Sequence, residues 1–238
     1  MQEPISYFYE KTGFKRSLIS RYIIGDKFVC IMLEDGHIGL CSTLGTRIDP
    51  EILENDTPPD TGREGDRIIL NAYFNALCNY SNEYEENADI LDAVDFSLFD
   101  DVVMIGYFET LYEKFRKVNP SLHVFDRQVE NSDTEPISTM YEVISSTNAV
   151  VVTGTTLFNG SLLEIINATN DGCSVFLLGP SNILHTDMFK YRNVKMVFGS
   201  VFDSFDTEIF KQIEKGAHAR EFLRLKNKVY IKSDNTVF

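Results

Sequence analysis

Short apolar runs alternate with helical patterns from residue 99 to the end of the chain. Runs of this length that are rich in Val and Ile are typical of strands buried on both faces of a parallel sheet. Strands that alternate with helices predict an α/β fold with a doubly wound, Rossmann-like parallel sheet. We expect strands at 102–105, 122–125, 149–152, 174–178 and 194–198, a helix that ends at 117, and helices at 138–146 and 203–215.

Residues 1–98 follow a different pattern. Apolar segments predict strands at 21–24, 27–33 and 37–43, and Glu34-Asp35-Gly36 favours a hairpin turn between the last two. Helices are expected at 3–18, 66–80 and 82–94, and the stretch 44–65, with its Pro and Gly residues, is interpreted as a loop over a site. We therefore predict a small α+β domain, 1–98, followed by the Rossmann-like domain, 99–238.

The stretch 148–167 holds the first candidate site. Its β-branched strand is followed by the small polar turn Thr153-Gly154-Thr155-Thr156 and by a helix that begins near Asn159. In open α/β sheets, ligands bind at the carboxyl ends of the strands, where this turn lies. Its hydroxyl groups and the N–H groups of a helix N-terminus favour an anionic or strongly polar ligand. The alternative, in which Thr, Asn and Ser only cap the helix, requires the same residues and stays open.

Three other predicted strands also end in small or polar residues, at Gly106, at Asp126 and at Gly179-Pro180-Ser181. In a Rossmann-like sheet these ends line one crevice. Asp126 follows Gly106 by 20 residues, the place of the acid that binds ribose in nucleotide-binding folds; an ordinary strand-end acid is the alternative. The turn lacks the GxGxxG glycines, and Tyr107 and Phe108 would crowd a pyrophosphate, which disfavours NAD.

Composition narrows the function classes. The formal net charge of −14 disfavours binding to nucleic acid or to an anionic membrane. We find neither a signal peptide nor the roughly 20 consecutive apolar residues of a membrane span. The four cysteines form no CxxC pair, which favours reduced thiols in a cytoplasmic protein. The four histidines show no metal-ligand spacing, and the basic segment 211–232 is interpreted as a helix with a solvated face.

Several motifs resemble those of the putative heavy-metal chelation family (DUF364) and of the DUF4213 domain that precedes it there. The more specific pair is TGTTLFNGSL at 153–162 with LGPS at 178–181. Weaker matches are IIG at 23–25, DGHIGL at 35–40, NAYFNA at 71–76 and IGYF at 105–108. The resemblance implies an enolase N-terminal-like domain before the Rossmann-like domain, with a pocket between them. It also implies condensation or hydrolysis steps in pterin, flavin or siderophore-type chelator metabolism.

These observations predict a small-molecule ligand in the cleft between the domains. Asp126 and Glu109 are the candidate catalytic carboxylates, acting as acid, base or hydroxyl-binding group. The pattern identifies no cofactor, leaves open whether the protein is an enzyme, and allows a homodimer on base rates alone. The candidate ligand-binding residues are Gly39, Asn75, Gly106, Tyr107, Phe108, Thr153, Gly154, Thr155, Thr156, Asn159, Ser161, Gly179, Pro180 and Ser181.

Two alternatives remain. A scaffold protein would have kept the fold and lost the chemistry. A non-catalytic metal- or chelate-binding protein would hold a hard cation with acidic loop side chains, although their spacing fits no loop motif. The candidate side chains are Glu54, Asp56, Asp60 and Glu64.

Overall fold

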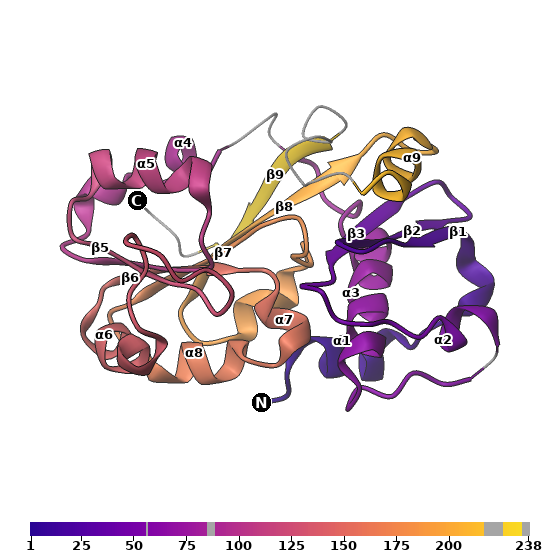
Figure 1. Cartoon of the computed structure of the whole chain (residues 1–238), viewed down its shortest axis with the longest axis horizontal. Helices are drawn as coiled ribbons and strands as arrows, with labels where there is room; N and C mark the ends of the chain where they lie inside the picture. The colour runs from indigo at the N-terminus through magenta and orange to yellow at the C-terminus, as the bar shows by residue number, and fades with distance from the viewer. Residues whose placement is uncertain (56, 85–88, 217–225, 235–238) are drawn as a thin grey trace.

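Two β-sheets lie side by side in the computed structural model of the chain, which describes residues 1–55, 57–84, 89–216 and 226–234 (Figure 1). Within these ranges, one sheet has three antiparallel strands in the order β1-β2-β3. The other has six strands in the order β5-β4-β6-β7-β8-β9 and is parallel except for its last strand. This arrangement confirms the predicted mixed α/β fold.

The three-stranded sheet is formed by consecutive segments, β1 (Ile19–Ile24), β2 (Phe28–Leu33) and β3 (Ile38–Ser42). Residues of β2 alternate between two buried faces, as expected for a strand. One face, with Val29 and Ile31, packs on helix α3 (Glu64–Cys78). The opposite face, with Cys30 and Met32, packs on helix α9 (Glu208–Glu214), which comes from the other end of the chain.

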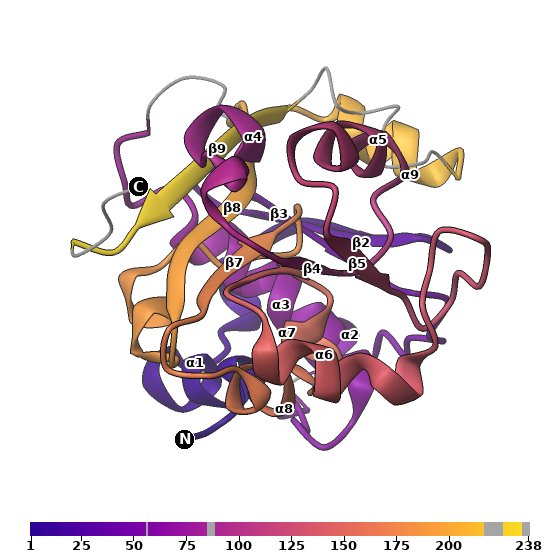
Figure 2. The same ribbon diagram turned by 90° about the vertical axis from the view of Figure 1, so that its left-hand side faces the viewer.

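The six-stranded sheet is covered by helices on both faces (Figures 1 and 2). Alternate residues of β4 are buried on opposite faces of the sheet. Met104 packs on the face covered by α4 (Ile90–Ala93) and α5 (Glu109–Val118), and Val103 packs on the face covered by α6 and α8. Burial of both faces explains the nearly continuous apolar runs of the sequence. The strands are β4 (Val102–Ile105), β5 (Leu122–Phe125), β6 (Ala149–Thr153), β7 (Ser174–Leu178), β8 (Val194–Phe202) and β9 (Lys226–Lys232).

The lower face of this sheet carries α6 (Met140–Ser146), α7 (Thr156–Asn159) and α8 (Leu162–Ala168). Helix α1 (Pro4–Thr12) packs on both α3 and α7, so it joins the two sheets. The remaining short elements are α2 (Glu51–Glu54) and the 3-10 helices η1 (Arg16–Leu18), η2 (Phe96–Leu98), η3 (Ile137–Thr139) and η4 (Thr186–Lys190). None of the helices in the described ranges is long and apolar enough to cross a lipid bilayer.

The structure corrects several helix predictions. The segment 211–232 was predicted to be helical, but its last part, Lys226–Lys232, forms the edge strand β9; residues 217–225 lie outside the described ranges. Val229 and Ile231 pack on the core, and Lys228 and Lys232 suit an edge strand, where lysines discourage further pairing. Of the helix predicted at 82–94, only Ile90–Ala93 is helical, and 85–88 are not described. The helix predicted at 3–18 ends at Thr12, and Gly13, which follows it, has a φ of 69°.

The boundary predicted at residue 98 and the enolase-like character of the front part stay predictions. One hydrophobic core cluster extends across both sheets, from Ile31 in β2 to Val197 in β8. The sheets are therefore joined by apolar packing over their common side.

Candidate functional site

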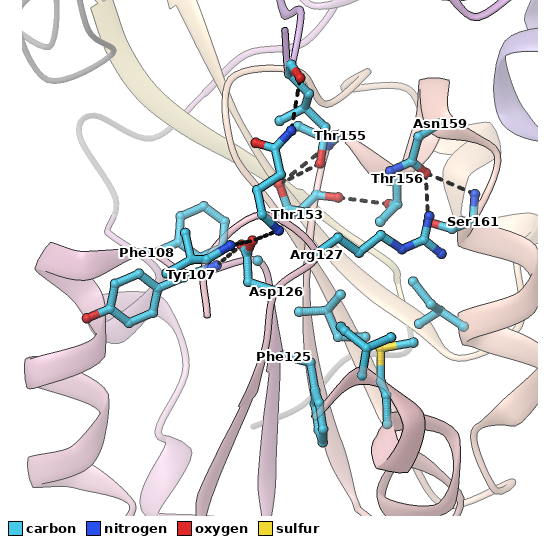
Figure 3. Close-up of a pocket in the computed structure, with 18 of the residues that line it drawn as sticks. Tyr107, Phe108, Phe125, Asp126, Arg127, Thr153, Thr155, Thr156, Asn159 and Ser161 are labelled. Carbon is cyan, nitrogen blue, oxygen red and sulfur yellow. Dashed lines mark hydrogen bonds between the residues drawn. The ribbon is translucent and has the colours of Figure 1, made fainter. Parts of the chain in front are cut away.

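The strand order places a crossover between β4 and β6, because the chain runs outward from β4 to β5 and then returns past β4 to β6. Such a switch point leaves a crevice outside the carboxyl ends of the strands. A cavity of about 450 Å³ lies there. Its polar and charged wall is formed by Asp126, Arg127, Thr153, Thr155, Thr156, Asn159 and Ser161 (Figure 3).

The turn after β6 is held by its own side chains. Thr156 Oγ1 donates to the carbonyl of Thr153 over 2.8 Å, and Ser161 Oγ donates to Asn159 Oδ1 over 2.7 Å. Gly160, with a φ of 74°, separates α7 from α8, and the helix predicted to begin near Asn159 is α8, with Ser161 at its N-cap position. Since α7 is about one turn long, its N-terminus adds little to anion binding. The expectation that the N-terminus of the following helix binds an anion stays a prediction. The hydroxyl oxygens remain able to accept further hydrogen bonds.

Asp126 ties two strand ends together. Its Oδ2 accepts the backbone N–H of Tyr107 over 2.7 Å, and its Oδ1 accepts those of Gln128 and Val129 over 2.7 and 2.8 Å. A carboxylate has about four lone-pair positions, so one acceptor position is left for a ligand. The geometry thus favours hydroxyl binding over proton transfer for Asp126. Glu109, the other catalytic candidate, lies in the exposed first turn of α5 and is not part of the cavity wall.

The close contact between the end of β4 and the end of β6 requires a glycine at position 106. Its φ is 99°, and a side-chain Cβ there would lie 2.8 Å from Cβ of Thr153. The two strand ends therefore approach each other more closely than any larger residue would allow.

The opposite wall of the cavity is apolar and aromatic. Tyr107 and Phe108 line it at the end of β4, and Phe125 lines it at the end of β5. The Tyr107 hydroxyl donates to Asp133 over 3.1 Å, which fixes the position of its ring. The other apolar residues that line the cavity, apart from Leu44, are Ile105, Val129, Ile137, Met140 and Ile165. A ligand with a flat apolar body and polar edges would match both walls.

Arg127 is a charged side chain of the cavity lining that the sequence analysis missed. It is exposed, lines the cavity, and extends across it toward Asn159 and Ser161 (Figure 3). It also interacts with the hydroxyl of Tyr141. A guanidinium has five N–H donors, so donors remain for an anion. Its only sequence signal is its place directly after the strand-end residue Asp126.

The first sheet contributes the rim of the cavity. Leu44 and Thr46, from the loop after β3, and Glu64, at the start of α3, complete the lining. Gln128 Nε2 donates to the carbonyl of Leu44 over 2.9 Å, which connects the rim to the loop after β5. The loop 44–65 thus reaches the site at its two ends.

Six predicted ligand-binding residues lie outside the cavity lining. Gly39 is at the contact of β3 with α3, where a Cβ would lie within 3.0 Å of two backbone atoms of the helix. Asn75 Nδ2 donates to the carbonyls of Leu40 and Pro180, over 2.8 and 3.1 Å. Ser181 Oγ accepts the N–H of Ser42 over 3.1 Å. These contacts connect the two sheets behind the cavity wall, where Gly154 and Gly179 also lie.

Metal-binding side chains are not gathered in the described part of the chain, where no group of three or more His, Cys, Asp or Glu is placed to hold an ion. In the acidic loop, Asp60 Oδ1 accepts the N–H of Gly62 over 2.8 Å, and Glu64 accepts the hydroxyl of Thr46 over 2.6 Å. Asp56 lies outside the described residues.

A comparison with protein families identifies the chain. The sequence model of DUF364, described as "Putative heavy-metal chelation", matches residues 89–232. The chain belongs to the DUF364 family. The match begins at residue 89, so the assignment of the front part to DUF4213 stays a prediction. No curated protein matches the sequence.

Two solved structures of DUF364 proteins, both of unknown function, share this fold. The one from Pyrococcus horikoshii has a TM-score of 0.76 and 16% identity, covering 90% of this chain and 93% of its own. The one from Desulfitobacterium hafniense has a TM-score of 0.76 and 17% identity, covering 96% of this chain and 98% of its own. At these identities the comparison establishes the DUF364 fold, and function has to be argued from the site.

Proposed function

We propose that this DUF364 protein binds an anionic small molecule with a flat, apolar body in the cavity at the β4/β6 crossover. The observation that carries the proposal is the position of Arg127, whose side chain extends toward Asn159 and Ser161 in a cavity that Tyr107 and Phe108 also line. Arginine binds carboxylate and phosphate groups with paired N–H donors. The formal net charge of −14 disfavours anion binding by the chain as a whole, so a guanidinium in a cavity wall marks a local exception.

Pterins and flavins have flat ring systems with polar edges, and the family resemblance suggests their metabolism or that of siderophore-type chelators. Their ring edges would accept or donate hydrogen bonds at Thr153, Thr155 and Asn159, and their faces would pack on Tyr107 and Phe108. Asp126 would accept one ligand hydroxyl or ring N–H through its remaining lone pair. Condensation or hydrolysis is the proposed reaction class. Of the described lining residues, the carboxylates are Asp126, whose contacts favour binding of a ligand hydroxyl, and Glu64.

Binding of flavin mononucleotide and of a pterin carboxylate, measured by calorimetry, tests the proposal. Arg127→Gln should weaken binding by about tenfold to a hundredfold, because one charge-assisted contact stabilises by about 1.5–3 kcal/mol. Thr155→Val, which keeps the shape and removes a hydroxyl, should cost a few-fold. Lys117→Gln removes the same charge from the exposed end of α5 and is the matched control.

Equal affinities for the wild type and Arg127→Gln would contradict the proposed site. A similar loss in Lys117→Gln would show that the affinity reflects only the net charge. Product analysis by mass spectrometry, with Asp126→Asn as the comparison, then separates an enzyme from a binding protein.

A further inference from the structure

The sequence contains a single Asn-Gly pair, Asn159-Gly160, and its asparagine lines the polar wall of the cavity. Glycine leaves the preceding peptide bond unshielded, because it carries no side chain. The space around Gly160 is also open, since a Cβ built there would meet no atom within 4 Å apart from its chain neighbours. The backbone nitrogen of Gly160 therefore has little steric protection from the side chain of Asn159.

The side chain of Asn159 is folded back over the following peptide. Its Oδ1 accepts the Ser161 N–H over 3.1 Å, which closes an Asx turn, a hydrogen-bonded ring that includes the Gly160 nitrogen (Figure 3). The Ser161 hydroxyl donates to the same oxygen over 2.7 Å. Two donors on one amide oxygen withdraw electron density from the amide carbon and stabilise a negative charge that develops on the oxygen.

Three other asparagines close the same turn and serve as internal comparisons. The Oδ1 atoms of Asn119, Asn131 and Asn170 accept the N–H two residues further on, over 3.0, 2.8 and 2.9 Å. They are followed by proline, serine and aspartate, respectively. The Nδ2 groups of Asn119 and Asn170 each donate to two backbone carbonyls, which hold these amides in place. Among the described residues, only Asn159 combines this turn with a following glycine and a second donor to Oδ1.

The Asn159-Gly160 bond lies at the end of α7. This helix is four residues long, and a helix of one turn is marginal and frays at its ends. A rotation about ψ of Asn159 therefore requires no change in β6 or in α8. Asn159 and Gly160 are both partly exposed, so water has access to them.

We infer that Asn159 is a site of self-modification, at which the Gly160 nitrogen attacks the side-chain amide. The nitrogen forms a bond to Cγ of Asn159, the bond from Cγ to Nδ2 breaks, and the proton of the Gly160 N–H leaves with Nδ2 as ammonia. Water then opens the cyclic imide at one of its two carbonyls, which gives aspartate or isoaspartate. Water is the only reactant consumed.

The modification changes the charge of the cavity wall. The product has a carboxylate where Asn159 has a neutral amide, on the side toward which Arg127 extends (Figure 3). A carboxylate in this place competes with an anionic ligand for the guanidinium. This consequence rests on the proposed function, whereas the chemistry at Asn159 does not.

Incubation of the native protein at pH 8 tests the inference. Liquid chromatography with mass spectrometry of tryptic peptides separates the amide, aspartyl and isoaspartyl forms of each asparagine. We expect conversion at Asn159 before conversion at any of the three comparison asparagines, at a rate at least equal to that of the same site in urea. Ser161→Ala should slow the native conversion about twofold to tenfold, the range that one hydrogen bond contributes, and leave the rate in urea unchanged. Melting temperatures show that the variant is folded.

Ser132→Gly is the matched control for the second donor. It gives Asn131 a following glycine in the same kind of turn, with no hydroxyl donor to Oδ1. We expect conversion at Asn131 of this variant to stay slower than conversion at Asn159. An equal or faster rate would show that the following glycine alone sets the rate, and would overturn the role of Ser161.

Asn159→Asp reproduces one product and tests the consequence for binding. It should weaken the binding of flavin mononucleotide several-fold. Asn131→Asp adds the same charge at an exposed position outside the cavity lining and should change the affinity by less than about twofold. If flavin mononucleotide does not bind the wild type, the proposed function fails, and conversion at Asn159 is still measured on its own.

Two results would overturn the inference of self-modification. In one, Asn159 is converted much more slowly in the native protein than in urea, which would show that the fold protects it. In the other, a comparison asparagine is converted before Asn159 in the native protein. Equal affinities of the wild type and Asn159→Asp for flavin mononucleotide would overturn the consequence for binding alone.

Discussion

Substituting Gly39 by Ala tests the contact between the first sheet and its helix. A Cβ at this position would lie within 3.0 Å of the Ala72 carbonyl oxygen and of the Ala76 backbone nitrogen. Backbone atoms in the middle of a helix cannot rotate away as a flexible side chain can. The helix α3 would therefore have to move away from β3 as a unit, although eleven of its fifteen residues are buried.

The cost follows from two losses. Forcing one extra methyl group into a packed contact costs about 1–3 kcal/mol. Moving α3 also stretches the hydrogen bond from Asn75 to the Leu40 carbonyl, and a buried bond of this kind contributes about 1 kcal/mol. We expect Gly39→Ala to lower the free energy of unfolding by about 2–4 kcal/mol, a large part of the typical 5–15 kcal/mol.

Urea denaturation followed by circular dichroism measures this change, with Gly172→Ala as the matched control. Gly172 is exposed, and a Cβ there would meet only the Asn170 side chain, at 3.4 Å, so we expect a change below about 0.5 kcal/mol. If Gly39→Ala is as stable as the control and has an unchanged denaturant slope, the close approach of β3 and α3 is wrong. If it is stable but loses ligand affinity, Gly39 acts in binding and not in packing.

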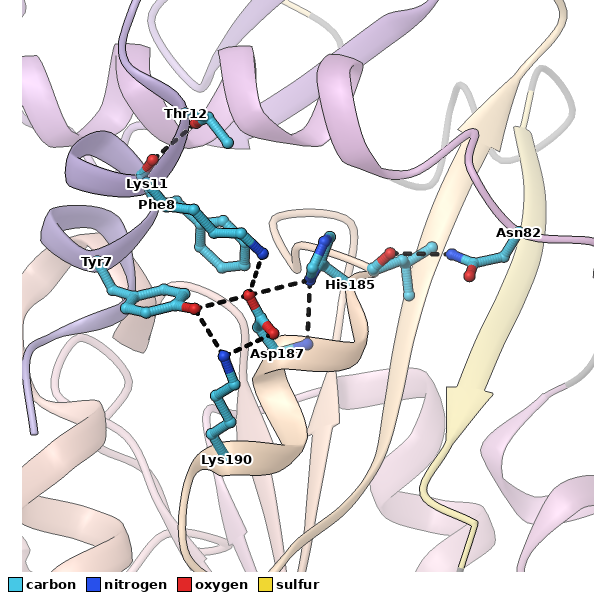
Figure 4. A network of polar contacts seen from close by, with 9 residues as sticks. Tyr7, Phe8, Lys11, Thr12, Asn82, His185, Asp187 and Lys190 are labelled. Atoms are coloured by element: carbon cyan, nitrogen blue, oxygen red, sulfur yellow. Dashed lines mark hydrogen bonds and ion pairs between the residues drawn. The ribbon is translucent and has the colours of Figure 1, made fainter.

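Three further predictions concern other parts of the molecule. Asp187→Asn should cost about 3 kcal/mol at pH 7 in urea denaturation, because it removes the charged acceptor shared by two lysines and a tyrosine (Figure 4). Although burial disfavours its charged form, those hydrogen bonds hold the pKa of Asp187 below the ordinary 3.8. The stability difference between the wild type and Asp187→Asn should therefore be constant above about pH 4 and shrink below it. A stability difference that does not depend on pH would refute this. Asp133→Ala removes the acceptor of the Tyr107 and Tyr112 hydroxyls. It should lower the melting temperature by about 2–4 °C and weaken ligand binding in the cavity. An unchanged ligand affinity would show that the Tyr107 ring needs no anchor. The thiols of four residues are buried, and burial raises the pKa of each; they are Cys30, Cys41, Cys78 and Cys173. A thiol reagent at pH 8 should therefore leave the native protein unmodified and label all four thiols in denaturant. Fast labelling of any one thiol in the native protein would contradict its burial.

The strands of the parallel sheet were largely predictable, because burial on both faces leaves an apolar run in the sequence. The edge strand β9 was not, because 211–232 is rich in good helix formers and a strand there depends on its partner, β8. Tertiary contact decided against local preference at this position.

The candidate site shows the same division. Asp126 and the Thr153–Thr156 turn were found because parallel strands end at one edge of a sheet, which is a rule of topology. Gly39 and Asn75 were placed in the site from motif resemblance, whereas the structure gives them contacts between elements. Arg127 carries no periodic or spacing signal, so its place in the cavity required the coordinates.

The packing of α9 on the first sheet has a consequence for synthesis of the chain. Residues 28–40 present a row of apolar side chains whose cover is translated only when the ribosome reaches residues 208–214. At ordinary elongation rates this delay is on the order of 10 to 30 seconds. During that time the nascent sheet is a substrate for chaperones, and a ribosome stalled before residue 208 should release a product prone to aggregation.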